Sequence, residues 1–170
     1  SRAACRTRYG PHMTKSSLGI ILSFVLPLLL AAPVLAGFDE GKAAYKAGDY
    51  ETALPELRAA ADGGHARAQY MLGSMYNEGK GVAPDRAVAA EWWQKAAAQD
   101  HAQAQFALGV LYSSGKGAAK DNVAAHMWFS LAAEQGKRNA KRLLKVIVTQ
   151  MTPEQIAEAA QMAEDWRAAN

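Results

Sequence analysis

Three short strings in this sequence carry residue types that could do chemistry. Ser113 and Lys116 form an S-x-x-K string, a spacing in which a lysine can activate a serine for acyl transfer. His65 and His101 offer imidazoles that could bind a metal. The string Gly79-Lys80-Gly81 belongs to the glycine-rich type of loop that can cradle a phosphate. Each chemistry requires companion residues, so we asked whether those companions are present.

The S-x-x-K string lacks the companions of a serine nucleophile. No S-D-N or K-T-G string follows it, and no acid–base pair gathers near it in the sequence. An upstream copy of the same segment has Asn77-Glu78-Gly79-Lys80 at the equivalent positions, which indicates a loop between two helices. We therefore expect a protein that is not an enzyme. A hydrolase of cell-wall or β-lactam substrates in the cell envelope is the alternative hypothesis.

Metal and nucleotide chemistry are disfavoured by spacing. Two metal-binding histidines on one helix stand four residues apart, whereas His65 and His101 occupy equivalent positions of two sequence copies. They are predicted to start helices, and the isolated His126 is predicted to be a packed side chain. The Gly-Lys-Gly string lacks the third glycine and the preceding strand of a nucleotide site. The sequence therefore predicts no metal site and no cofactor.

Composition and charge narrow the class of protein further. Half of the 170 residues are hydrophobic but only 8% are aromatic, and alanine makes up the difference, which favours closely packed helices. Four of the 19 Lys and Arg residues precede residue 16, and from Gly37 onward 15 basic and 16 acidic residues give a net charge of −1. This balance does not support a nucleic-acid-binding face. The sole cysteine, Cys5, leaves the rest of the chain without disulfides or thiol ligands.

The N-terminal segment has the order of a secretory signal. Residues 18–36 form an apolar run that follows Lys15 and ends in small residues. This order predicts cleavage between Ala36 and Gly37 and a mature protein that is periplasmic or secreted. A start at Met13 would give the signal better proportions. The alternative is an uncleaved helix that anchors a membrane-tethered assembly factor in the inner membrane, because a run of this length can just span a bilayer.

The rest of the chain is organised by an internal repeat. Residues 65–100 align with residues 101–136 without a gap. A fixed period of this length is typical of stacked copies of one supersecondary unit. The identical pairs include Leu72/Leu108, Gly73/Gly109, Tyr76/Tyr112, Gly79/Gly115, Gly81/Gly117, Asp85/Asp121, Trp92/Trp128 and Ala96/Ala132.

Each copy predicts two helices joined by a glycine-containing loop. Gly73 lies beside the apolar stripe in the middle of the first helix, at a cost of about 1 kcal/mol relative to alanine, which is tolerable where a second helix approaches closely. Gly79 and Gly81 are predicted to end that helix, and Asp85 to cap the start of the next. Helical spacing assigns the tryptophans to the packed core rather than to a ligand cage: Trp92, Trp93, Trp128 and Trp166.

Further helical hairpins are predicted on both sides of the two copies. Residues 37–64 form a shorter, tetratricopeptide-like hairpin, and residues 137–170 form a degenerate capping hairpin with polar outer residues. Thr152 begins the last helix, with proline and glutamine at favourable positions after it. The sequence predicts eight helices in all. The apolar face expected for the last one comprises Ile156, Ala159, Ala160, Ala163 and Trp166.

The repeat pattern resembles a known family. The string A-x-A-Q-Y/F-x-L-G-x-x-Y-x-x-G-K-G, followed by D, W and A-A-x-Q, is similar to the Sel-one-like repeat, a 36-residue relative of the tetratricopeptide repeat, over about residues 38–136. The resemblance implies an all-α fold, a right-handed α-solenoid of stacked antiparallel helix hairpins. It also implies a concave surface, lined by the first helix of each repeat, that binds proteins or peptides, often in bacterial envelope complexes.

The exposed face of the first helices is the predicted binding site. At about 100° per residue, one position in each copy places an aromatic side chain opposite the core, flanked by small and amide side chains. The alternative is that Tyr70 and Phe106 pack against the next repeat. The leading hypothesis is a non-catalytic exported scaffold that binds a protein or peptide and no nucleic acid. Its predicted contact residues are Arg67, Tyr70, Ser74, Asn77, Gln103, Phe106, Val110 and Ser113.

Overall fold

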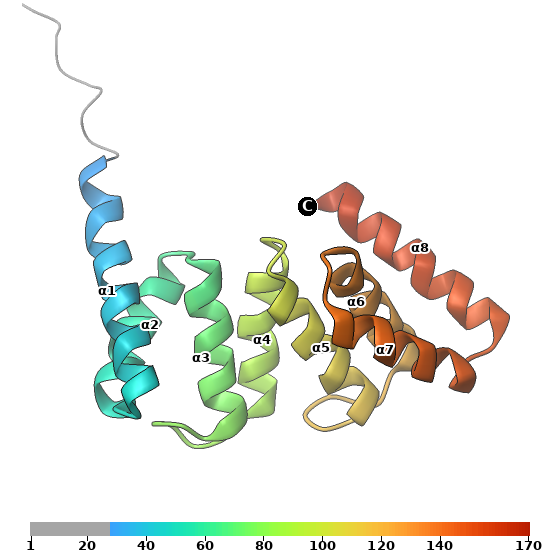
Figure 1. Ribbon diagram of the computed structural model, residues 1–170, viewed down its shortest axis with the longest axis horizontal. Coiled ribbons are helices and arrows are strands. Elements are labelled where there is room, and N and C mark those ends of the chain that lie inside the picture. Colours follow the sequence, from blue (N-terminus) through green and yellow to red (C-terminus); the bar gives the residue numbers. More distant parts are fainter. Residues whose placement is uncertain (1–27) are drawn as a thin grey trace, which may run out of the picture.

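Residues 28–170, which the computed structural model describes, contain helices and no strands. Side chains are described from Gly37 onward. This architecture confirms the predicted all-α fold and its eight helices, which Figure 1 shows in chain order along the molecule. The elements are α1 (Leu28–Ala47), α2 (Tyr50–Asp62), α3 (Ala66–Glu78), α4 (Arg86–Ala97), α5 (Ala102–Ser114), α6 (Asn122–Glu134), α7 (Arg138–Ile147), a 3-10 turn (Val148–Gln150) and α8 (Pro153–Ala169).

The predicted export signal lies largely outside the described residues, as do Cys5 and Met13. Helix α1 begins at Leu28, so the predicted cleavage position after Ala36 falls within this helix. Among the described helices, none combines the length and the apolar character that a bilayer crossing requires.

The first six helices pack as three successive pairs. Helix α1 packs on α2, α3 on α4 and α5 on α6, while α2–α3 and α4–α5 contacts join one pair to the next. Apolar side chains from neighbouring pairs share continuous cores, in which Trp92, Trp93 and Trp128 are buried as predicted. A hairpin cannot cover its own apolar face, so each pair depends on its neighbours for burial.

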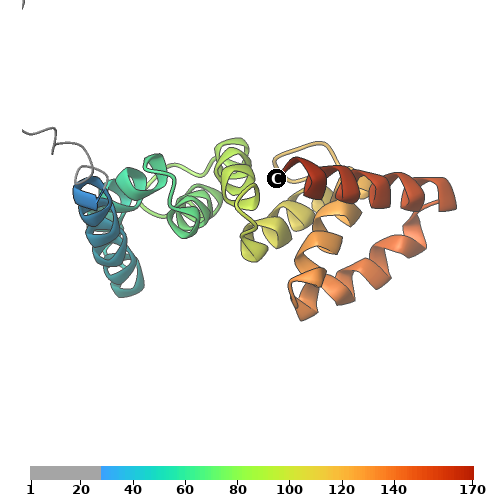
Figure 2. The same cartoon turned by 90° about the horizontal axis from the view of Figure 1, so that it is seen from above.

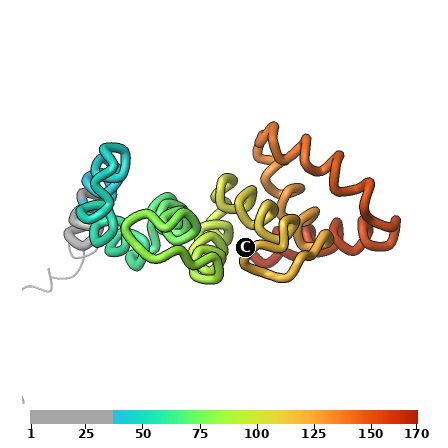
Figure 3. Tube along the Cα trace, turned by 90° about the horizontal axis from the view of Figure 1, so that it is seen from below, coloured from blue at the N-terminus to red at the C-terminus, as the bar shows by residue number. Residues whose placement is uncertain are grey.

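The C-terminal unit, predicted as a degenerate capping hairpin, contains α7 and α8. Helices α7 and α8 both pack chiefly on α6. Figures 2 and 3 show the two helices diverging from the turn that joins them. Because α8 packs chiefly on one helix, its buried stripe is narrow. Ala159 and Ala163 are buried, whereas Ala160, expected on the same face, is exposed.

The predicted caps define where these helices begin and end. Asp85 and Asp121 each accept a hydrogen bond from a free backbone amide at the start of the second helix of a repeat. Thr152 and Gln155 form the expected reciprocal capping box at the start of α8. Gly79 ends α3 with a φ of 70°, a left-handed conformation that favours glycine.

A helix glycine permits close packing within each repeat. A Cβ atom placed on Gly73 would lie 2.6 Å from Cδ1 of Trp93, and one on Gly109 would lie 2.5 Å from the ring of Phe129. These distances are far below van der Waals contact. The helices of each pair therefore approach closely because the position carries no side chain, as the sequence predicts.

A buried glutamine in each repeat bonds to the unit before it. Gln69 donates through Nε2 to the carbonyl of Ala61 (3.1 Å) and accepts through Oε1 from Nε2 of Gln99 (2.8 Å). Gln105 repeats both bonds, donating to the carbonyl of Ala97 at 3.5 Å and accepting from Nε2 of Gln135 at 2.8 Å, and it is fully buried. Since a buried amide without partners is costly, the bonds to Ala61 and Ala97 help to fix the junctions between units. The bonds from Gln99 and Gln135 join the two helices of one repeat.

Candidate functional site

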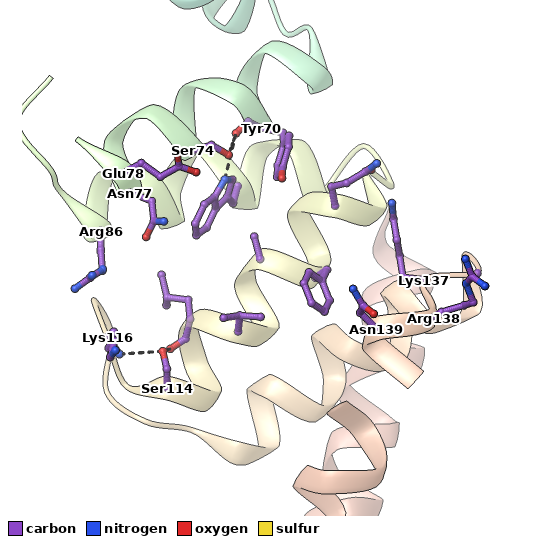
Figure 4. A pocket seen from close by; sticks show the side chains of 17 residues that line it. Tyr70, Ser74, Asn77, Glu78, Arg86, Ser114, Lys116, Lys137, Arg138 and Asn139 are labelled. Carbon is purple, nitrogen blue, oxygen red and sulfur yellow. Dashed lines mark hydrogen bonds between the residues drawn. The ribbon is translucent and has the colours of Figure 1, made fainter. Parts of the chain in front are cut away.

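A groove of about 690 Å³ lies between α3 and α5, with α4 at its base and the start of α7 at one end. Figure 4 shows Tyr70, Ser74 and Asn77 along α3, with Arg86 and Lys116 at the opposite end from α7. Since each wall comes from a different repeat, stacking is what creates the site.

Six of the eight predicted contact residues line this groove. Arg67 and Ser113 lie outside it. The guanidinium of Arg67 lies over the ring of Phe38, 5.5 Å from its centroid. Ser113 contributes to a separate small cavity beside Phe129. Binding by the other six stays a prediction, but the fold brings them together: Tyr70, Ser74, Asn77, Gln103, Phe106 and Val110.

The two predicted aromatic contacts also pack against neighbouring side chains. The ring of Tyr70 lies 5.0 Å from that of His101, which belongs to the next repeat. Phe106 lies 5.8 Å from Phe129, which belongs to the second helix of its own repeat rather than to the next repeat. Both rings are half-buried and line the groove as well. Packing therefore fixes their orientation and leaves part of each ring accessible.

The base of the groove is apolar. It includes Trp93 and Leu111, both buried, and Val110, which is 40% exposed. The indole Nε1 of Trp93 donates to the carbonyl of Tyr70 at 3.2 Å, which fixes the ring under the α3 wall. Helical spacing assigned Trp93 to the core alone. Spacing within one helix gave no indication that an edge of this ring would face a groove formed with the next repeat.

The rim of the groove is basic. It carries Arg86, Lys116, Lys137 and Arg138, whereas its one acidic residue, Glu78, forms an ion pair with Lys80 at 2.7 Å. Within residues 37–170, none of the four cations forms an ion pair. A charge count averaged over the whole body conceals this cluster. A local count would have found only the end formed by Lys137 and Arg138, since residues 135–153 contain five Lys or Arg and no acid.

His65 and His101 cap helices, as predicted. Nδ1 of each ring accepts a hydrogen bond from the backbone amide three residues later, at 3.2 and 3.3 Å. Burial lowers the pKa of His101, and the nearby charges of Lys137 and Arg67 lower it further. The neutral imidazole that results can accept the capping bond.

The described residues do not assemble the other chemistries that the sequence raised. The hydroxyl of Ser113 donates to the carbonyl of Val110 at 3.0 Å and faces a different cavity from the one that Lys116 lines. Serine and lysine of the S-x-x-K string therefore do not share a site. Between residues 28 and 170, no three His, Cys, Asp or Glu side chains gather in a way that could hold a metal ion.

Comparison with known proteins identifies a repeat and its structural relatives. Residues 66–101 and 102–137 each match the Sel1 repeat. A Sel1 repeat protein from Oxalobacter formigenes is 39% identical with a TM-score of 0.61, over 68% of this chain and 90% of that one. A protective antigen of uropathogenic Escherichia coli with an SLR fold is 27% identical with a TM-score of 0.75 over 81% of this chain. The chain spans 30% of the length of that antigen. No curated protein matches it.

Proposed function

Because the chain belongs to the Sel1 repeat family, we propose that it binds a protein or peptide partner in the groove between α3 and α5, without catalysis of its own. Sel1 repeats generally mediate protein interactions, and this chain is a scaffold of that type. The proposal adds the location of the binding surface.

One observation carries the proposal. The groove combines a recessed apolar base with side-chain amides and hydroxyls on its walls, in a volume of about 690 Å³. Recognition sites commonly have this composition, because apolar burial supplies affinity and the polar groups fix orientation. Val110 is 40% exposed in the groove and offers an apolar surface that a partner can cover.

Photo-crosslinking in living cells tests this location. A benzophenone amino acid replaces Val110 in the full chain, and a matched protein carries it at Met162, which is 38% exposed on α8 and outside the groove. We expect a discrete crosslinked partner from position 110 and none from position 162. Crosslinks of equal yield at both positions, or at position 162 alone, would contradict a binding site in the groove.

We also propose that the protein is exported, on the strength of the apolar run at residues 18–36 and the small residues that end it. Sequencing the N-terminus of the protein recovered from the cell envelope tests this. A chain that begins at Gly37 is the expected result. An intact segment in the membrane fraction would instead support the tethered alternative.

A further inference from the structure

The first end of the groove carries two cations that the fold holds close together. Gly117 has a φ of 102°, and a Cβ on it would lie 2.3 Å from Cβ of Arg86, so the second repeat's loop lies directly against the start of α4. Figure 4 shows both Arg86 and Lys116 at this end of the groove. Each comes from a different repeat, so the pair exists only in the stacked molecule.

Comparison of the two repeats shows why Lys116 is unneutralised. Its equivalent, Lys80, contacts the carboxylate of Glu78 at 2.7 Å and the hydroxyl of Tyr45 at 3.2 Å. In the second repeat, Ser114 occupies the position of Glu78 and supplies no charge; its hydroxyl donates to the carbonyl of Leu111 and accepts a bond from the backbone amide of Lys116. The second repeat thus keeps the lysine and loses the acid.

The opposite end of the groove carries a second pair of cations. Lys137 occupies the position that His65 and His101 hold in the earlier repeats, but its side chain makes no capping hydrogen bond. Arg138, the first residue of α7, is exposed beside it. Positive charge at a helix N-terminus is unfavourable, so helix stability does not explain this pair.

The base between the two ends is apolar, because it is formed by Phe106, Val110 and Trp93. The groove is therefore positive at both ends, with an apolar base between them. Its acid, Glu78, already pairs with Lys80. This charge is local, since the body from Gly37 onward carries a net −1.

We infer that the occupant of the groove is an acidic peptide segment, whose carboxylates meet the cations at the two ends while an apolar side chain between them packs on Phe106 and Val110. The inference rests on the proposed function and specifies its partner. An anionic membrane would also attract basic residues, but a bilayer surface is flat on this scale and cannot reach the recessed base between α3 and α5. The geometry therefore favours a peptide.

An array of random peptides tests the charge preference before the natural partner is identified. The full chain is applied to the array, and binding is scored against the net charge and apolar content of each peptide. We expect bound peptides to be rich in Asp and Glu around an apolar residue. The inference would be overturned if the bound peptides were mostly neutral or basic, or if no peptide bound.

Matched variants then test the residues. The best-binding acidic peptide and its Glu→Gln counterpart are titrated against Lys116→Gln/Lys137→Gln and against the control Lys46→Gln/Lys95→Gln, which removes the same charge from exposed sites outside the groove. We expect about a tenfold loss of affinity for the groove variant, under twofold for the control, and weaker binding at high salt. Equal losses in both variants would overturn the inference.

The failure of this inference is distinguishable from failure of the proposed function. If neutral apolar peptides bind and position 110 still crosslinks to a partner, the groove is a binding site but not one selective for acids. Vesicles containing phosphatidylglycerol provide the remaining comparison. The inference of an acidic peptide would be overturned if the chain sedimented with these vesicles, the groove variant did not, and no acidic peptide bound. The groove cations would then be assigned to a membrane surface.

Discussion

The histidines that precede α3 and α5 have a structural role that their residue type alone does not indicate. Two imidazoles in equivalent positions raise the possibility of metal binding, yet each accepts a capping bond from its own helix. Serine, threonine, aspartate and asparagine usually hold this position. A histidine does so only while it is neutral, because protonation of Nδ1 removes the acceptor. The cap therefore depends on pH.

We predict that the protein loses stability as the pH falls below 6.5, and that His101→Asn reduces this loss. Burial lowers the pKa of His101 from 6.5, so the unfolded chain binds the proton first. The contribution of neutral His101 to the free energy of unfolding is therefore complete above pH 6.5. It is lost as the pH falls through the lower pKa that His101 has in the folded protein. Asparagine caps without titrating in this range. Urea unfolding at about pH 7.5 and about pH 5.5 measures the difference.

Burial also lowers the pKa of His126, so part of the pH dependence remains in His101→Asn. An unchanged difference between the two pH values would show that the cap at residue 101 does not titrate with folding.

Within the helix pairs, the sequence predicted close packing because it placed glycine where helix propensity disfavours it. Gly109 lies in the middle of α5, against the ring of Phe129. Helix starts and stops were also predictable, since Asp, Thr-Pro and Gly have local effects that do not depend on the rest of the fold. The divergence of α7 and α8 was not, because it depends on which surface of α6 each helix covers.

Gly109→Ala is predicted to destabilise the protein even though it improves helix propensity. The gain of about 1 kcal/mol from propensity is outweighed by overpacking against Phe129, for a net loss on the order of 1 kcal/mol. Gln103→Ala, on the exposed face of the same helix, should leave stability unchanged or slightly higher. Thermal unfolding followed by circular dichroism compares the two. A more stable Gly109→Ala protein would mean that α5 and α6 can separate without cost.

On the scale of the whole molecule, α8 closes the array by a narrow contact. The ring of Trp166 meets that of Trp128 at 4.8 Å, and Arg167 bonds both carboxylate oxygens of Glu134 at 2.7 and 3.1 Å. Terminal units of repeat proteins protect the last core surface from water. Here that surface belongs to α6.

Trp166→Ala should lower the free energy of unfolding by about 2 kcal/mol, because it removes part of the cover over Trp128. The fluorescence of the remaining tryptophans should shift to the red as Trp128 becomes hydrated. Met162→Ala, on the exposed side of the same helix, serves as the control and should change neither property. A variant with unchanged stability would show that α8 contributes little to the array.

The groove between α3 and α5 was predictable only in part at this scale. Helical periodicity identified Tyr70 and Phe106 on one exposed face, because that face follows from spacing within a single helix. It could not identify Arg86 or Lys137, which reach the groove from a loop end and from the unit that follows the second repeat. These two residues join the groove only because the repeats stack, and the spacing of residues within one helix carries no information about stacking.

The glutamine bonds between units have a consequence for how such a protein can lengthen. Donor and acceptor stand at fixed positions of the 36-residue unit, so Gln69 and Gln105 each donate to a carbonyl eight positions earlier, in the unit before. A duplicated gene segment encoding one whole unit would meet matching partners on both sides and leave no amide unsatisfied. Lengthening by whole units therefore requires no new interface to evolve, whereas insertion of part of a unit would separate these glutamines from their partners.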